Sequence, residues 1–342
     1  MLTRIYNQIL NESSSSKTFV GLDALRGWAI MAVVMLHAGH LGLINYGQKL
    51  NIFIESGQLG VQLFYIISSF SLCLSLQERK GESHWLGKYL LRRIFRIAPL
   101  YFLIVLYYIW PNPSEYSWEK IVTVFTLTNG FFPNLCTGIA NGSWSISVEF
   151  VFYCLLPVIF LYFNSANKLI LLLGISCFLA AKTITSGHPN AYYYITYQLG
   201  VFLIGCLAYY FWANPKYKIS AIYVFPLVVY IFLGKPPHQH FVFGTICCLL
   251  LYSAIQNPQN FVLGKPIQYI GKVSYGIYLI HFIVTDKLDQ MNPQYLDFGV
   301  GWLTLPARFS LVLLISTILA TISYIAIERP AIRWGRKLIS MI

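Results

Sequence analysis

The chain has 342 residues, of which 57% are hydrophobic and only 11% are charged. Soluble globular domains carry about 25% charged residues, so this composition excludes an ordinary soluble domain and indicates a membrane protein. The formal net charge of +12 makes a nucleic-acid partner the rival interpretation, but the basic residues edge apolar segments instead of lining one soluble face.

Apolar segments of membrane-spanning length recur along the whole chain. A helix needs about 20 apolar residues to cross a hydrocarbon core of about 30 Å. The pattern predicts an all-α polytopic protein with about ten transmembrane helices, at residues 28–45, 59–77, 95–110, 147–163, 169–185, 192–212, 220–233, 241–256, 273–286 and 307–327. The weaker apolar run 118–132 is predicted to lie on or dip into the membrane surface. We expect one membrane-embedded domain over residues 1–342, with a polar tail at 1–17.

The basic residues support this topology. With the N-terminus in the cytoplasm and the spans alternating, most of the 24 Lys and Arg residues fall on the cytoplasmic side. The exceptions are Lys49, Lys120, Lys182, Lys235, Lys287 and Arg308. An excess of Lys and Arg in cytoplasmic loops is the usual signature of membrane insertion. We therefore predict that both termini are cytoplasmic and that the protein lies in the plasma membrane, which is the inner membrane in a bacterium.

The first span carries two ionisable side chains. Arg26 and His37 are eleven residues apart, which in an α-helix places them about 20° apart around the axis and about 16 Å apart along it. The guanidinium of Arg26 is predicted to lie at one membrane surface. The imidazole of His37 is predicted to lie near mid-bilayer, on nearly the same face of the helix. Ionisable groups at that depth usually face a cavity or a partner, so both are candidate functional residues.

The loop before the third span is rich in basic residues, namely Arg79, Lys80, Lys88, Arg92, Arg93 and Arg96. Positive-inside topology and snorkelling explain part of this charge. Arg93 and Arg96 stand out because they lie at i, i+3 on one helix face, where two guanidiniums can bind phosphate groups. A polyphosphate cofactor such as coenzyme A and an anionic lipid headgroup suit them equally.

Two further ionisable groups lie in or near predicted spans. Glu149 follows Trp144 and Ser147 at the entrance to the fourth span, with Tyr153 one turn further on. Interaction with the helix dipole and a role in orienting an imidazole both explain this position. His281 lies inside the ninth span, where an ionisable side chain is a candidate functional residue, although a structural role also explains a single buried histidine.

Three other features are not expected: a disulfide framework, a metal site and a cleavable signal peptide. All but one of the seven cysteines fall inside predicted spans, and none has a CxxC spacing, so we expect neither a disulfide framework nor a metal site. Residues 1–20 have no apolar core adequate for a cleavable signal peptide.

Taken in order, these stretches resemble acyltransferase family 3, a family of integral membrane proteins. The matches are Leu22-Asp23-Ala24-Leu25-Arg26-Gly27 with His37; Gly60-Val61-x-Leu63-Phe64; Arg93-x-x-Arg96-Ile97-x-Pro99-x-Tyr101; Ser143-Trp144-Ser145-Ile146-Ser147-Val148-Glu149-x-x-Phe152-Tyr153; Ser274-Tyr275-Gly276-Ile277-Tyr278-Leu279-Ile280-His281; and Glu328-Arg329-Pro330. The chain departs from the family pattern at Ser69, where the family usually has Gly, and at Phe150, where it usually has a second acid. Both departures bear on the fine geometry of the acceptor or acyl pocket.

The resemblance implies an enzyme that moves an acyl group, usually acetyl, from cytoplasmic acetyl-CoA to a sugar hydroxyl of a surface polysaccharide or its lipid-linked precursor. It assigns Arg26 and His37 to a catalytic pair, in which His37 is the general base because imidazole titrates near physiological pH. The other candidates are Glu149 for catalysis, Arg92, Arg93 and Arg96 for the donor, and Trp144, Ser147, Tyr153, Tyr275 and His281 for the acceptor side.

Two alternatives stay open. A proton-coupled transporter also buries His, Arg and Glu among many spans, although no pair of Gly- or Pro-broken segments marks two matching halves. An acyltransferase with a lipid acceptor would use the same chemistry. The sequence does not specify the acceptor, the acyl chain length or the oligomeric state.

Overall fold

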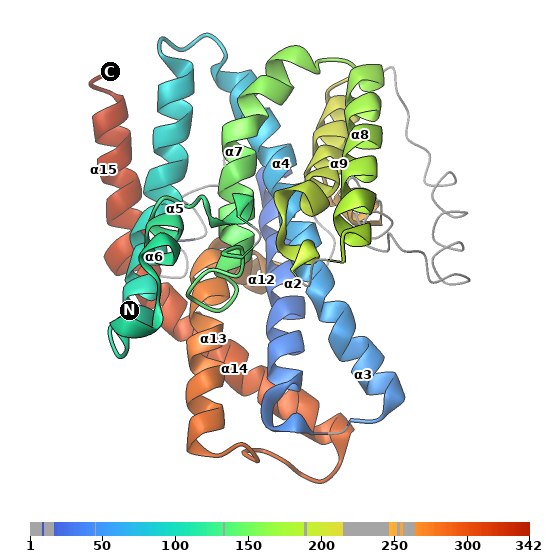
Figure 1. The fold of residues 1–342 in the computed structure, drawn as a ribbon, viewed down its shortest axis with the longest axis vertical. Helices are drawn as coiled ribbons and strands as arrows, with labels where there is room; N and C mark the ends of the chain where they lie inside the picture. The colour runs from blue at the N-terminus through green and yellow to red at the C-terminus, as the bar shows by residue number, and fades with distance from the viewer. Residues whose placement is uncertain are drawn as a thin grey trace. The chain divides into compact units, whose positions relative to one another are not determined.

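The computed structural model describes residues 9, 17–44, 46–132, 134–187, 190–214, 246–251, 254–255 and 264–342. Within these ranges every regular element is helical, which confirms the all-α class (Figure 1). The helices pack into two compact units, one formed by Met1–Phe64 with Ser253–Ala326 and the other by Tyr65–Tyr252 with Ile327–Ile342. Because packing units need not fold independently, the prediction of a single domain stays a prediction.

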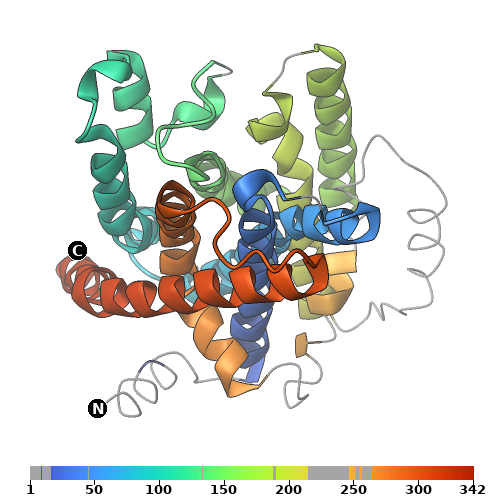
Figure 2. The same cartoon turned by 90° about the horizontal axis from the view of Figure 1, so that it is seen from below.

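In the first unit, α2 (Lys17–Gly39) is the central helix. It packs against α12 (Lys265–Lys272), α13 (Ser274–Met291) and α14 (Gly301–Ser323), which all come from the C-terminal part of the sequence. Figure 2 shows α14, in orange-red, running across α2. The unit also contains η1 (Leu41–Leu43), α3 (Gln48–Glu55), η2 (Ser56–Gln58) and the first residues of α4 (Leu59–Arg79).

Glycines permit the closest contacts of α2. A methyl group at Gly27 would collide with the backbone of Ile267, and one at Gly271 would collide with the backbone of Asp23. Gly60 brings the start of α4 against α2 in the same way. Small residues that let backbones approach are the usual means by which membrane helices associate.

The second unit is built around α7 (Ser143–Tyr162) and α9 (Ile195–Ala213). The ring of Phe202 stacks with Tyr65 of α4 and with Phe152 of α7, at centroid distances of 4.2 and 4.1 Å, and this stack joins the three helices. The other elements of the unit are α5 (Trp85–Ile109), η3 (Pro113–Glu115), α6 (Trp118–Phe125), η4 (Asn129–Phe131), α8 (Ala166–Thr185), η5 (Ala191–Tyr193) and α15 (Arg329–Ile339). A π-helical turn, η8 (Tyr324–Glu328), joins α14 to α15.

Six helices in the described ranges are long and apolar enough to cross a membrane: Val20–Gly39, Gln48–Arg79, Ser143–Tyr162, Ala166–Thr185, Ile195–Ala213 and Gly301–Ile339. Each overlaps one predicted span, so the multi-pass membrane character is confirmed. The predicted spans 95–110 and 273–286 lie within the helices α5 and α13, which are not among the six. Outside the predicted spans these helices carry further charged residues, Lys88, Arg92 and Arg93 in α5 and Lys287 and Asp289 in α13. The predicted span 220–233 lies outside the described residues, as does half of the predicted span 241–256. The count of ten and the cytoplasmic termini therefore stay predictions.

Several predicted boundaries are wrong. The helix of the first span begins at Lys17 instead of residue 28 and ends at Gly39 instead of residue 45, because the chain turns at Gly42, whose φ is 66°. The helix of the third span begins at Trp85, so part of the predicted basic loop is helical. Hydropathy identifies only the apolar part of a helix. Polar turns at its ends have the same backbone hydrogen bonds, so they belong to the helix although the hydropathy pattern misses them. Within the run 118–132, α6 has only 8 residues, too few to cross a membrane.

Candidate active site

Arg26 lies beside an acidic residue of the same helix. Its Nη1 donates a hydrogen bond to Oδ1 of Asp23 at 2.9 Å, and Oδ2 of Asp23 is 3.9 Å from Nζ of Lys272 on α12. The Asp23 carboxylate is nearly buried and balances charge from both cations. Sequence reasoning missed this role of Asp23, although an acid three residues before an arginine on a helix is a readable pairing signal.

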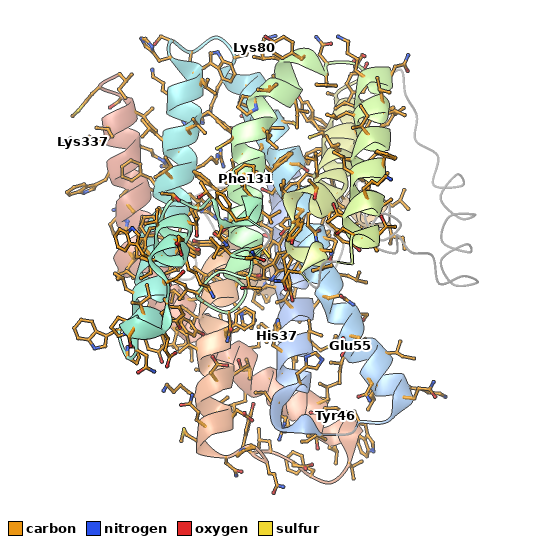
Figure 3. All side chains as sticks on the ribbon, viewed as in Figure 1. His37, Tyr46, Glu55, Lys80, Phe131 and Lys337 are labelled. Atoms are coloured by element: carbon orange, nitrogen blue, oxygen red, sulfur yellow. The ribbon has the colours of Figure 1, made fainter. Side chains whose placement is uncertain are left out.

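His37 lies further along α2 (Figure 3). Its side chain is half-buried. Its imidazole contacts two side chains of α13, because its ring centroid is 5.2 Å from that of His281 and 4.4 Å from that of Phe282. The ring of His40 is 6.5 Å away. The helical rise separates Arg26 from His37 by about 16 Å, so the two residues share a helix but have different partners.

His281 is fully buried on α13. Its Nδ1 donates a hydrogen bond to the carbonyl oxygen of Ile277 at 3.0 Å, whereas its Nε2 has no hydrogen-bond partner among the described residues. Tyr278 is the tyrosine beside it, with ring centroids 5.8 Å apart. Tyr275, half-buried on the same helix, projects about 120° away from His281 around the axis. The structure thus brings His37 and His281 together, although the sequence places them in separate spans.

Glu149 is the acceptor of a hydrogen-bonded cluster in the second unit. Its Oε1 accepts hydrogen bonds from the hydroxyl of Ser68 at 2.5 Å and from the hydroxyl of Tyr153 at 2.6 Å. Because α7 begins at Ser143, Glu149 lies in its second turn, beyond the first turn to which the dipole effect is confined. Contacts with the two hydroxyl groups therefore account for this carboxylate better than the helix dipole does. Sequence reasoning did not identify Ser68 as a partner.

Ser69, which departs from the family pattern, is accommodated inside the second unit. Its hydroxyl donates to the carbonyl oxygens of Tyr65 and Ile66 at 2.9 and 3.1 Å, so its added polar group is satisfied within α4. The facing residue of α9 is Gly205, where a methyl group would collide with Oγ of Ser69. In the family pattern the glycine is at position 69. In this chain Gly205, on the facing helix, leaves room for the side chain of Ser69 instead. The structure offers no comparable account of Phe150.

Two of the basic residues near the start of α5 form ion pairs. Glu82, in the turn between α4 and α5, accepts hydrogen bonds from Nη2 of Arg92 at 2.5 Å and from Nη1 of Arg79 at 3.1 Å. The bond from Arg92 lowers the pKa of the Glu82 carboxyl below its usual range. Arg92, predicted to contact the donor, is therefore engaged within the protein.

Arg93 and Arg96 differ from their neighbours. Neither forms a hydrogen bond or salt bridge with any residue in the part of the chain that the structure describes, and the Nε atom of Arg93 is buried. The guanidinium of Arg93 lies 5.7 Å from the ring centre of Tyr89 and within electrostatic range of Tyr153 and Glu149. Two guanidiniums at i, i+3 that form no salt bridge with a described residue are well suited to bind phosphate groups.

The remaining predicted acceptor residues on α7 have different surroundings. Trp144 packs in an aromatic cluster with Tyr192 and Tyr193 of η5, at centroid distances of 5.4 and 4.9 Å. Ser147 is fully buried and donates a hydrogen bond to Oδ1 of Asn129, which ties η4 to α7. The hydroxyl proton of Ser147 is thus already used within the protein. A contact of Ser147 with substrate stays a prediction.

A model of the family described as "Acyltransferase domain" matches residues 19–325. The protein ORF330 of Acidianus two-tailed virus, whose name gives it the provisional designation acetyltransferase, is 27% identical over 77% of this chain and 82% of its own length. The O-acetyltransferase OatA of Staphylococcus aureus is 21% identical over 96% of this chain, and the peptidoglycan O-acetyltransferase OatA of Listeria monocytogenes is 23% identical over 78%. This chain spans only 59% and 49% of the lengths of these two proteins. No solved structure gives a significant match.

Proposed function

Because the chain belongs to acyltransferase family 3, we propose that this membrane O-acyltransferase moves an acetyl or other short acyl group from cytoplasmic acyl-CoA to a hydroxyl group of a glycan. Two relatives are named O-acetyltransferases, and the name of the Listeria protein specifies peptidoglycan. These names support acetyl as the group and a cell-surface polysaccharide, or its lipid-linked precursor, as the acceptor. The membrane would be the plasma membrane, which is the inner membrane in a bacterium.

The observation that carries the proposal is the state of His37. Its imidazole is half-buried in an apolar helix and forms no hydrogen bond to any described residue, so its nitrogens are available to a substrate. When a hydroxyl attacks a thioester, one proton must leave the hydroxyl and one must reach the departing thiolate. A single imidazole can take the first proton and deliver it to the sulfur, so the reaction balances without a further acid.

Arg93 and Arg96 would hold the phosphates of the donor. Neither forms a salt bridge with a described residue, whereas the neighbouring Arg92 and Arg79 are paired with Glu82. A bidentate guanidinium is a strong phosphate ligand. Arg26, balanced by Asp23, would steady the donor or the negative charge that develops on the attacked carbonyl.

The acceptor would approach from the opposite membrane face. Glu149, with the hydroxyl groups of Ser68 and Tyr153 bonded to it, supplies hydrogen-bonding groups suited to a sugar. We expect acetyl-CoA to support transfer only from the cytoplasmic side of sealed vesicles of known orientation, because the basic residues of α5 mark that side. Transfer from donor supplied only at the outer face would overturn this arrangement.

The central test compares two neighbouring histidines in vesicles that contain the purified protein, labelled acetyl-CoA and a glycan acceptor. His37→Ala should lower transfer by at least about 100-fold, the usual contribution of a general base. His40→Ala is the matched control, because His40 is half-exposed and bonded to Glu55 at 2.7 Å. Transfer by His37→Ala at the wild-type rate, with the protein folded, would exclude His37 as the base. Solute uptake with no consumption of acetyl-CoA would favour the transporter.

A further inference from the structure

The hydrogen bonding of His281 decides which of its nitrogens carries a proton. A backbone carbonyl can only accept, so the 3.0 Å contact between Nδ1 and the oxygen of Ile277 requires the proton on Nδ1. A neutral imidazole holds one ring proton, so Nε2 carries a lone pair and acts as an acceptor. The backbone of α13 therefore presets His281 as the Nδ1–H form.

The acceptor nitrogen of His281 is buried but unused. The residue has 0% exposed surface, and Nε2 has no hydrogen-bond partner in the described part of the chain. Native proteins rarely leave a buried polar atom unpaired, and each exception calls for an explanation. The neighbouring groups that can titrate are His37 on α2 and Tyr278 on α13 itself, with ring centroids 5.2 and 5.8 Å away.

His37 is the natural donor to this nitrogen. Because ring nitrogens lie outside the ring centre, two imidazoles with centroids 5.2 Å apart reach hydrogen-bond distance when an N–H group of one and a lone pair of the other point along the line between the rings. A turn of the His37 ring leaves the Nδ1 bond of His281 intact. Phe282 packs against both rings, at 4.4 Å from His37 and 4.0 Å from His281, and its ring offers neither of them a hydrogen-bond acceptor such as Nε2. All three side chains belong to the first unit, in which α2 and α13 pack together.

We infer that His281 is a positioning residue for His37: its Nε2 accepts a hydrogen bond from one ring N–H of His37 and leaves the other ring nitrogen of His37 as the base. This inference rests on the proposed function, in which His37 takes the proton from the sugar hydroxyl. After that transfer His37 carries two N–H groups; one stays bonded to His281 and the other gives its proton to the departing thiolate. His281 keeps its own proton on Nδ1 throughout.

A neutral acceptor suits this location. Acid–base sites often use a carboxylate to orient a histidine, but an unpaired carboxylate within an apolar helix bundle is costly. An imidazole fixed by its own backbone provides the same directed lone pair without a full charge. His281 thus belongs with His37, on the proton-transfer side of the reaction, instead of with the residues that contact the acceptor.

Three variants test the inference through kcat and KM. His281→Phe keeps a planar ring but removes the acceptor, so kcat should fall at least about tenfold with little change in the KM of acetyl-CoA or glycan. His281→Gln places an amide oxygen near the position of Nε2, so it should recover much of the lost kcat. Phe282→Leu is the matched control, because it alters packing against both histidines and removes no acceptor; its kcat should stay near that of the wild type.

Thermal unfolding of each variant in detergent separates a catalytic effect from loss of the fold. Wild-type kcat in a folded His281→Phe protein would overturn the inference, as would a folded His281→Gln protein no faster than His281→Phe. A different result would contradict the proposed function, namely acyl transfer by His37→Ala at the wild-type rate. A dead His37→Ala protein with a fully active His281→Phe protein would leave the general base intact and exclude the positioning role.

Discussion

Two arginines, one in each unit, reach into the protein and have opposite surroundings. Arg308 of α14 has 0% exposed surface, and its three nitrogens donate to the carbonyl oxygens of Tyr295, Leu41 and Pro293 at 2.9, 2.5 and 3.0 Å. Its guanidinium also lies 4.7 Å from the ring centre of Tyr295. Arg93 of α5 has a buried Nε without a partner among the described residues.

The contrast shows that depth alone does not identify a functional arginine. Each nitrogen of Arg308 donates to a backbone carbonyl, and the side chain is fully buried, so Arg308 joins η1 to the segment before α14 and is not accessible to a ligand. Arg93 is left with unused donors beside Tyr89, which is costly unless an anion binds. The hydrogen-bond balance of each guanidinium separates a structural cation from a binding one.

Removal of Arg308 should have the largest effect. Arg308→Ala removes three hydrogen bonds to backbone carbonyl oxygens, of which the one to Leu41 is buried and the other two are partly buried; at about 1 kcal/mol for each bond, we expect a loss of about 3 kcal/mol of stability. Arg308→Lys should lose less stability than Arg308→Ala, because an ammonium group keeps the charge but not the planar set of guanidinium N–H donors. Thermal unfolding in detergent measures both, with the exposed Lys287→Ala as control. An Arg308→Ala protein as stable as the wild type would show that Arg308 does not stabilise the fold.

Removal of Arg93 or Arg96 should instead weaken the donor complex. One lost charge-assisted contact to phosphate is worth about 1.4 kcal/mol or more, so each alanine variant should raise the KM of acetyl-CoA about tenfold or more. Lysine at either site should restore little. Arg92→Ala is the matched control, because Arg92 is already bound to Glu82. Equal KM values for all three variants would show that the unpaired state has no role in donor binding.

Neutralisation of Glu149 should affect rate more than stability. In Glu149→Gln the amide oxygen can still accept from Ser68 and Tyr153, so unfolding should change by less than about 1 kcal/mol. The lost charge lies within range of Arg93, and we expect transfer to fall about tenfold through the changed electrostatics. Parallel measurement of unfolding and initial rate decides this. If Glu149→Gln lost stability and kept its rate, the hydrogen-bonded cluster of Glu149 would have a structural role only.

The smallest effect should come from Glu82 and should depend on pH. Its folded-state pKa is lowered, chiefly by the bond from Arg92, so its contribution is fully present above the unfolded value near 4.5 and is lost as pH falls through the lower folded value. The pair is partly exposed, so less than about 1 kcal/mol is at stake. Glu82→Gln should therefore lower stability at pH 7 and approach wild-type stability at acidic pH. An unchanged difference between the two proteins across this range would contradict the assignment.

The residues most readily predicted were those related by a single helix. The eleven-residue spacing of Arg26 and His37 places both on α2, and the pairing of Arg93 with Arg96 follows from i, i+3 geometry on α5. The same local reasoning misplaced the ends of α2, since Gly42 turns the chain only in its folded context. It also could not separate Arg92 from Arg93, because the difference depends on Glu82, which lies in the turn before α5.

The sequence by itself determined the membrane class and the helical architecture, because hydropathy and helical periodicity act within about 20 residues. The order of its short motifs indicated the family and the candidate residues. Tertiary structure alone decided the partners: His281 meets His37, Ser68 meets Glu149, and Gly205 makes room for Ser69. These partners lie on helices far apart in the chain, where close approach depends on how whole helix faces pack and no local pattern records it.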